Sequence, residues 1–279
     1  MKRISFLFVS ILLVFLMVSC GLERDIDLNL PKYDKKLVVE CYLERGKPIR
    51  LLLTESQEFL SSSILPPDVP NATVKITNGN KVYNIPYRPE ADSAFGKVYN
   101  YTTDEIIPTE PQGEFFLEIR DSKGRKITGK TSFLEKLPIN EITWEFEDKD
   151  KEIKEDSAEA LVLMRHPISP SGDFYRFIIN KKEKENFSNQ LDFIYRGITA
   201  TNGEISIGTA YRFKNNDSLQ ILFFHIEKQF YNYIRSVEDA RDAAGNPFAQ
   251  PAPILSGVEG GIGIFTTLQS DEKYIVVTK

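Results

Sequence analysis

Cysteine and histidine are both scarce in this chain, with two of each among 279 residues. The histidines, His166 and His225, lie far apart, and neither belongs to a His-Glu-x-x-His pattern. The cysteines form no closely spaced pair, so the usual signatures of a zinc site are missing. A Gly-x-Ser-x-Gly elbow and a phosphate-binding loop are missing as well. We therefore expect no cofactor, no metal and no catalytic residue, and we interpret both histidines as structural.

An excess of basic residues is also lacking. The 35 lysines and arginines are outnumbered by 40 aspartates and glutamates, which gives a formal net charge of −5. Nucleic acids and anionic lipid surfaces are bound through basic patches. The charge balance therefore argues against nucleic acid as a partner.

No apolar run is long enough to span a membrane as a helix, which takes about 20 residues. The run over 4–18 follows two basic residues and ends in Met17-Val18-Ser19-Cys20. This pattern is typical of a secretory signal peptide, here residues 1–19. Its ending resembles a bacterial lipobox, in which Cys20 becomes the lipidated first residue of the mature chain. The alternative is an uncleaved anchor helix that ends at Cys20.

The segment 20–35 is polar and carries Glu23, Asp25 and Asp27, without apolar periodicity. We interpret it as a tether behind the lipid anchor. Acidic residues at this place resemble the surface-export signal of Bacteroidetes lipoproteins, and an ordinary solvated linker is the alternative. We expect a lipid-anchored outer-membrane protein that is exposed on the cell surface.

From residue 36 the sequence alternates like a series of β-strands. Leu37, Val39, Cys41 and Leu43 share one face of the first strand, so Cys41 is interpreted as a buried apolar residue and not as a catalytic thiol. Asn78-Gly79 is a strong hairpin-turn signal. Several short strands separated by turns predict an immunoglobulin-like β-sandwich over 36–135.

A second β-rich domain is predicted over 136–279, after a joint at Leu137-Pro138. Ile142, Trp144 and Phe146 alternate with polar residues, as in a half-buried strand. One segment, at about 227–243, has helical spacing and ends before Gly245-Asn246-Pro247. The fold class is therefore all-β and mainly antiparallel, with one substantial helix.

Three further patterns in the sequence are less specific. Acidic residues over 148–159 have the spacing of a calcium loop, but Ile153 stands where that loop needs glycine, so a solvated loop is the preferred interpretation. Exposed aromatic residues could form a sugar platform, with Tyr195, Tyr211 and Tyr231 as candidates. A carboxylate pair for glycoside hydrolysis is not singled out among the 40 acidic residues.

Several stretches together resemble the DUF4249 lipoproteins of Bacteroidetes, a family of unknown function. They are Asp25-Ile26-Asp27-Leu28, Lys36 to Glu40, Gly172 to Phe177, Asn246-Pro247-Phe248 and Val258 to Phe265. Members of that family are often encoded beside TonB-dependent outer-membrane receptors. The resemblance implies a non-catalytic lipoprotein that is accessory to such a transporter in nutrient uptake. The alternatives are a glycan- or ligand-binding lipoprotein that acts alone and a hydrolase with an unrecognised carboxylate site.

Exported proteins of this group can be O-glycosylated at Asp-Ser followed by a small or apolar residue. Three serines fit this pattern, and we expect each at a turn or the start of a strand, where a sugar can be accommodated. The candidates are Ser93, Ser157 and Ser218.

Cys20→Ala should leave the protein without lipid and change its partitioning into detergent, because the acyl chains are expected on this side chain. Metabolic labelling with a fatty-acid probe measures the effect. Equal labelling of the variant and the parent would contradict the lipobox interpretation.

Overall fold

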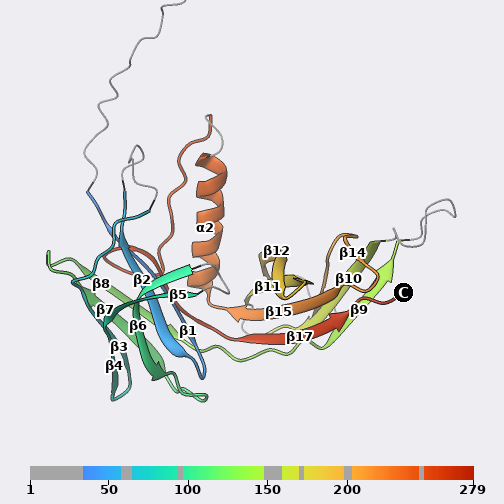
Figure 1. Ribbon diagram of the computed structural model, residues 1–279, viewed down its shortest axis with the longest axis horizontal. Coiled ribbons are helices and arrows are strands. Elements are labelled where there is room, and N and C mark those ends of the chain that lie inside the picture. The colour runs from blue at the N-terminus through green and yellow to red at the C-terminus, as the bar shows by residue number, and fades with distance from the viewer. Residues whose placement is uncertain are drawn as a thin grey trace, which may run out of the picture. The chain divides into compact units, whose positions relative to one another are not determined.

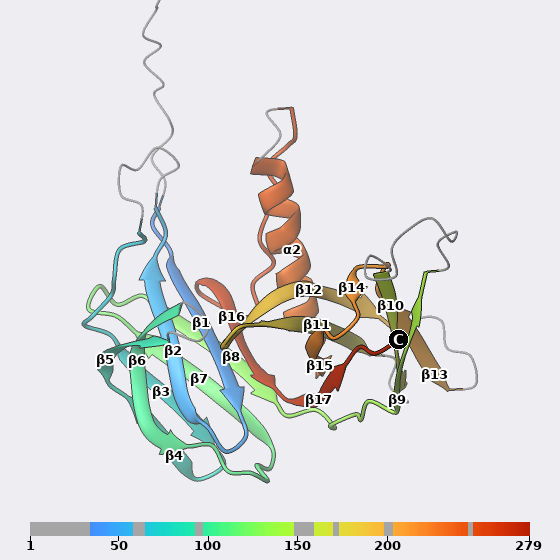
Figure 2. The same ribbon diagram turned by 45° about the vertical axis from the view of Figure 1, so that its right-hand side comes forward.

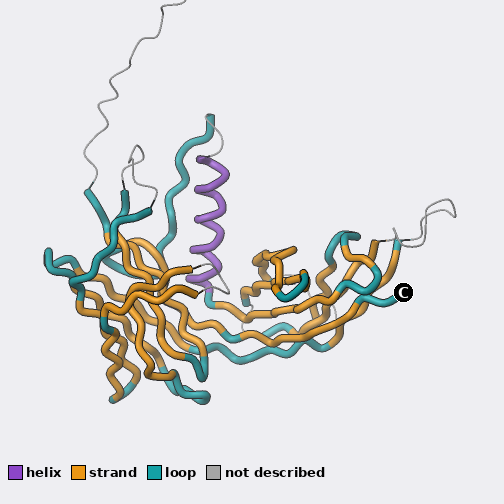
Figure 3. Tube along the Cα trace, viewed as in Figure 1, coloured by secondary structure: helices purple, strands orange, loops and turns teal. Residues whose placement is uncertain are grey.

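The computed structural model describes residues 34–57, 65–92, 97–147, 159–169, 173–197, 203–244 and 248–279. Their regular structure consists of strands β1 to β17 and the helix α2 (Lys228–Ala244), as Figures 1 and 3 show. All but one of the strand pairings are antiparallel. The predicted all-β, mainly antiparallel fold class is confirmed. In the part of the chain that the structure describes, no helix is both long and apolar enough to cross a membrane.

Two sheets form a first sandwich. One sheet has the order β16-β1-β2-β6-β5 and the other β4-β3-β7-β8. The strands are β1 (Leu37–Glu44), β2 (Pro48–Glu55), β3 (Thr73–Asn78), β4 (Lys81–Ile85), β5 (Tyr87–Asp92), β6 (Lys97–Ile106), β7 (Glu114–Arg120), β8 (Lys126–Ser132) and β16 (Ile262–Leu268).

The core of the first sandwich follows the alternation expected from the sequence. Leu37, Val39, Cys41 and Leu43 are all buried in it, because every second side chain of a strand points to the same face. Cys41 is fully buried, and burial raises the pKa of its thiol far above the ordinary value. The thiol therefore stays protonated and unreactive, and Cys41 packs in the core like a small apolar side chain.

Two strands of the first sandwich, β6 and β16, lack such alternation and were not predicted. In β6 the residues from Asn100 to Thr103 are all buried or nearly so. Asn100 is satisfied there because its amide exchanges two hydrogen bonds with the backbone of Leu53, at 2.8 and 2.6 Å. A buried amide that is fully bonded in this way carries no apolar signal in the sequence.

β16 is buried on both faces, which explains its unbroken apolar and threonine sequence. It pairs in parallel with β1, with Val38 opposite Ile262 and Glu44 opposite Leu268, and the two strands lie side by side in Figure 2. The first sheet thus takes in a strand from beyond the predicted boundary after residue 135. That the segment 36–135 forms a domain of its own stays a prediction, as does its immunoglobulin-like character.

Glycines make the close approach of β16 to β1 and β8 feasible. Gly263 has a φ of +126°, and a Cβ there would lie 1.8 Å from the carbonyl oxygen of Val39. Gly260 has a φ of +79°, and its Cβ would lie 2.1 Å from the carbonyl oxygen of Lys126. Only glycine fits where another backbone comes this near. The glycines of this stretch therefore serve close packing of the backbone.

The remaining strands form a second pair of sheets. The first has the order β13-β10-β14, with β9 also paired to β10, and the other has the order β12-β11-β15-β17. The strands are β9 (Glu141–Phe146), β10 (Glu159–Pro167), β11 (Phe174–Glu183), β12 (Asn186–Arg196), β13 (Glu204–Gly208), β14 (Phe213–Lys214), β15 (Ser218–Ile226) and β17 (Ser270–Val276). Leu137 and Ile139, from the predicted joint, are buried in the core of this second part.

The helix α2 closely matches the predicted range and packs against side chains of both parts. Phe230 and Tyr231 share a buried cluster with Ile264 of β16 and Ile226 of β15. The residue before the helix, Glu227, ties it to the first sandwich. Its carboxylate accepts hydrogen bonds from the hydroxyls of Thr131, at 2.5 Å, and Thr266, at 2.8 Å.

His166 lies fully buried among aromatic rings of the second core. Its Nδ1 is 2.8 Å from the carbonyl oxygen of Pro167, which can only accept, so Nδ1 carries the proton. Nε2 then accepts from the hydroxyl of Tyr195 at 2.7 Å. The neutral ring is thus fully bonded, and burial lowers the pKa of His166 to about 4. This supports the structural interpretation of the histidine.

Gly263→Ala should destabilise the protein by at least about 3 kcal/mol, because the new methyl group must displace the backbone of β1. The matched control is Gly124→Ala, since Gly124 has a φ of +81° with open space around it. It should cost only the strain of its dihedral angles, about 1–2 kcal/mol. Urea unfolding measures both variants, and equal losses would contradict the proposed role of the close contact.

Stability should fall as the pH is lowered from 6.5 toward about 4, the ordinary and the folded pKa of His166. In this window the unfolded chain binds a proton at His166 that the folded chain excludes, at up to about 1.4 kcal/mol per pH unit. His166→Gln should remove this part of the slope. Urea midpoints of the parent and the variant across the window measure the difference, and identical slopes would refute it.

Candidate ligand-binding groove

The sheet β12-β11-β15-β17 has one face in the second core and an opposite, outer face. Tyr175, Phe177 and Ile179 of β11 point into the core, so their neighbours along the strand point outward. At one end α2 covers the outer face through Phe174 and Phe230. The other end of that face is open and holds the groove described next.

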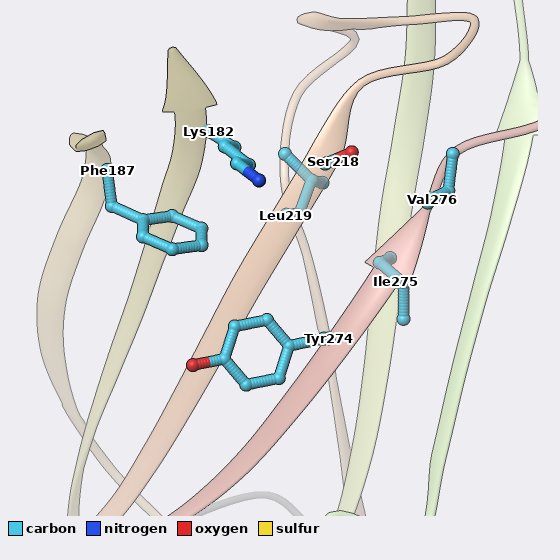
Figure 4. A pocket seen from close by; sticks show the side chains of 7 residues that line it. All are labelled: Lys182, Phe187, Ser218, Leu219, Tyr274, Ile275 and Val276. Atoms are coloured by element: carbon cyan, nitrogen blue, oxygen red, sulfur yellow. The ribbon is translucent and has the colours of Figure 1, made fainter. Parts of the chain in front are cut away.

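The groove has a volume of about 450 Å³, and Figure 4 shows the side chains that line it. Strand register brings these side chains together: Lys182 pairs with Phe187 across β11 and β12, and Ser218 pairs with Val276 across β15 and β17. The lining consists of Lys182, Phe187, Ser218, Leu219, Tyr274, Ile275 and Val276. Its size is within the range of small-molecule sites.

Two aromatic rings dominate the groove. The ring centroids of Phe187 and Tyr274 lie 6.0 Å apart, with 57° between the ring planes. The two residues are 43% and 64% exposed, respectively. They come from the two outermost strands of the sheet, β12 and β17, and Figure 4 shows them leaning toward each other across the strands between. The pair therefore offers two ring faces at an angle, open to solvent.

A ladder of polar side chains runs across the sheet beside the rings and holds Tyr274 in place. The hydroxyl of Tyr274 donates to Oε1 of Glu272 at 2.6 Å and accepts from Nε2 of Gln220 at 3.0 Å. Asn180 donates to Oε1 of Gln220 at 2.9 Å, and Asn189 donates to Asn180 at 3.2 Å. The bond to the Glu272 carboxylate raises the pKa of Tyr274. The ring is thus fixed by its own hydroxyl before any ligand arrives.

Lys182 supplies a positive charge at the rim of the groove. Its ammonium group points toward the space beside the two rings in Figure 4. Among the described residues its ammonium has no ion pair, whereas the neighbouring Lys181 is paired with Asp217 at 2.8 Å. No carboxylate belongs to the described lining of the groove. The site therefore favours a ligand with acceptor oxygens.

The structure does not bring the three predicted platform tyrosines together. Tyr195 is bonded to the buried His166, and Tyr231 lies on the buried face of α2. Tyr211 is exposed, and its hydroxyl donates to Glu145 at 3.2 Å, away from the groove residues. The sugar-platform hypothesis is therefore wrong for this set of tyrosines.

Several other predicted positions lie outside the described residues. They are the lipidation site Cys20, the leader and most of the tether, the glycosylation candidates Ser93 and Ser157, and all but the last residue of the calcium-like loop. Within the described ranges no group of three or more potential metal ligands occurs. Ser218 begins β15 and lines the groove, so a sugar attached there would occupy the space of a ligand.

Sequence reasoning missed Phe187 and Tyr274 as a pair. Tyr274 and Val276 lie two positions apart in β17, and such apolar spacing in a strand is the one local signal for this exposed apolar stripe. Phe187 follows a turn at Lys184, which has a φ of 57°. The register of β12 then shifts at Asn180, and no local pattern predicts that shift.

The second histidine also has structural partners. Nδ1 of His225 is 2.9 Å from the carbonyl oxygen of Glu135, to which it donates. Its Nε2 is 3.2 Å from a carboxylate oxygen of Asp173. His225 therefore fastens the connector between the two parts of the chain to β15.

Comparisons with known proteins bear on the family. A comparison with functionally curated proteins gave no match. Two solved structures are similar over part of their length: an alpha-2-macroglobulin mutant from Salmonella and trypsin-activated alpha-2-macroglobulin from Escherichia coli. The first has a TM-score of 0.26 and 9% identity, and the match covers 74% of this chain and 14% of that one. The second has a TM-score of 0.21 and 9% identity, with 75% and 16% covered.

This chain therefore spans less than a fifth of each of these large proteins, at TM-scores that carry no argument about fold or function. The match to a family is of a different kind. A single family model covers residues 23–274, which include every strand described above except the last two residues of β17. The chain belongs to the family described as Domain of unknown function (DUF4249).

Proposed function

We propose that this protein is a non-catalytic lipoprotein of the outer membrane that binds a ligand in the groove on the β12-β11-β15-β17 sheet. In this proposal it serves a TonB-dependent transporter in nutrient uptake, in a bacterium of the Bacteroidetes group. The observation that carries the binding function is the pair of exposed rings, Phe187 and Tyr274, in a groove with an ammonium group at its rim.

The groove is suited to binding because its parts are fixed in advance. The side chains stand on paired strands, which hold them more precisely than loops do. Tyr274 is further held by Glu272 and Gln220. A ligand would then lose little free energy in ordering the protein, which favours affinity.

Binding is favoured over hydrolysis by the chemistry of the lining. Glycoside hydrolysis normally uses two carboxyl groups on either side of the bond that breaks. The nearest carboxylate in the ladder, Glu272, is bonded to both Gln220 and Tyr274. His166 and Cys41 are buried in the two cores. Glu272 therefore holds the ring of Tyr274, and His166 and Cys41 contribute to core packing. A hydrolase stays the weaker alternative.

The accessory role rests on the predicted lipid anchor and on the resemblance to lipoproteins that are encoded beside transporters. A lipoprotein that binds its ligand alone, without a transporter, is the second candidate. The two candidates share the groove and differ only in the partner.

Affinity purification from detergent-solubilised outer membranes of the native host should recover a TonB-dependent receptor with the tagged protein. Mass spectrometry identifies the partner, and Cys20→Ala serves as the control, because the unanchored protein should lose it. Purification of the parent without any receptor would contradict the accessory role and leave the second candidate.

A further inference from the structure

We propose that the ligand of the groove is a saccharide, one ring of which stacks on the face of Tyr274. This inference rests on the proposed binding function and specifies its ligand class. It starts from the orientation of the rings. Tyr274 lies flat over the sheet in Figure 4, and Phe187 stands beside it, so the two form a floor and a side wall.

A pyranose ring fits such a corner because its face carries C–H groups and its edge carries hydroxyl groups. The C–H groups on a sugar face carry a slight positive charge and are attracted to the negative face of an aromatic ring. The aromatic face needs only a flat, C–H-rich partner and accepts it without a hydrogen bond. Val276 extends the apolar floor next to Tyr274.

The polar groups around the corner complement the hydroxyls at the edge of a sugar ring. Lys182 can donate up to three hydrogen bonds, and the Ser218 hydroxyl can donate and accept. Both line the groove, and the amides of Gln220 and Asn180 continue the polar surface along the ladder. Apolar contact on one side and hydrogen-bonding groups on the other are the combination that a saccharide needs.

Other ligand classes suit the groove less well. A lipid tail would leave the ammonium of Lys182 and the hydroxyl of Ser218 without acceptors. A peptide that adds a strand would need an open sheet edge, whereas this groove lies on a sheet face between β12 and β17. A saccharide satisfies both the rings and the polar rim.

The oxygen that reaches Lys182 can belong to a hydroxyl of a neutral sugar or to the carboxylate of a uronic acid. Both accept from an ammonium group, and the carboxylate does so more strongly. The test therefore uses a neutral and an acidic probe of equal length.

The experiment titrates cellohexaose and hexagalacturonate into the full-length protein in detergent and measures affinity by isothermal calorimetry. The parent should bind at least one probe, and Tyr274→Ala should weaken that binding at least about tenfold, as expected for an aromatic anchor. Tyr274→Phe keeps the ring and should stay within about threefold of the parent. Tyr211→Ala removes an exposed tyrosine outside the groove and should bind like the parent.

Lys182→Met separates the two oxygen sources. Loss of hexagalacturonate binding alone, together with a steep salt dependence in the parent, assigns the acidic saccharide. If Lys182→Met weakens the binding of both probes equally, the partner of Lys182 is a hydroxyl of a neutral saccharide. Thermal unfolding of each variant shows whether the fold is intact.

The saccharide inference is overturned if neither probe binds the parent more tightly than it binds Tyr274→Ala, or if Tyr274→Phe loses as much affinity as Tyr274→Ala. Recovery of a transporter with the parent protein would then leave the accessory function standing while the ligand class falls. If a sugar binds but no transporter is recovered, the ligand class stands and the accessory function falls.

Discussion

The parallel pairing of β16 with β1 is the interaction on which the rest of the described structure depends. Gly263 brings its backbone within contact distance of Val39, and this close approach fixes β16 beside β1 as the end strand of the first sheet. Phe265 then enters the first core, while Ile264, on the opposite face, enters the cluster beneath α2. One short strand therefore contributes to two hydrophobic clusters, which is why it is buried on both faces.

The same strand leads to the groove. Only Gln269 separates β16 from β17, so the position of β16 limits where β17 can begin. β17 pairs with β15 and places Tyr274 opposite Gln220, and that pairing lets the amide hold the phenol. The glycine-rich stretch Val258 to Phe265, which is part of the family resemblance, thus acts by positioning other residues. It needs no ligand of its own to explain its composition.

In the described part of the chain, most buried side-chain polar groups are hydrogen-bonded, and the exceptions are Nε of Arg45, Nε2 of His225 and Oε1 of Gln269. The neutral ring of His166 is bonded through both nitrogens. The carboxylate of Glu227 accepts hydrogen bonds from two threonine hydroxyls at the start of α2. Such groups stabilise the native state because breaking one bond leaves a buried partner unsatisfied. The two aromatic rings and the ammonium of the groove differ from these buried groups, because they are exposed to solvent and can still contact a ligand.

The sequence by itself determined the β-rich class, the helix near 227–243 and the alternating core of β1, because these depend on local periodicity that neighbouring residues specify. It also predicted that Cys41 is buried and that His166 is structural. Only the tertiary structure decided that β16 joins the first sheet, since burial on both faces removes the alternation that marks a strand. It alone paired Phe187 with Tyr274. Those residues lie on opposite edges of a four-stranded sheet, and only strand order and register, which are non-local, bring their rings to 6.0 Å.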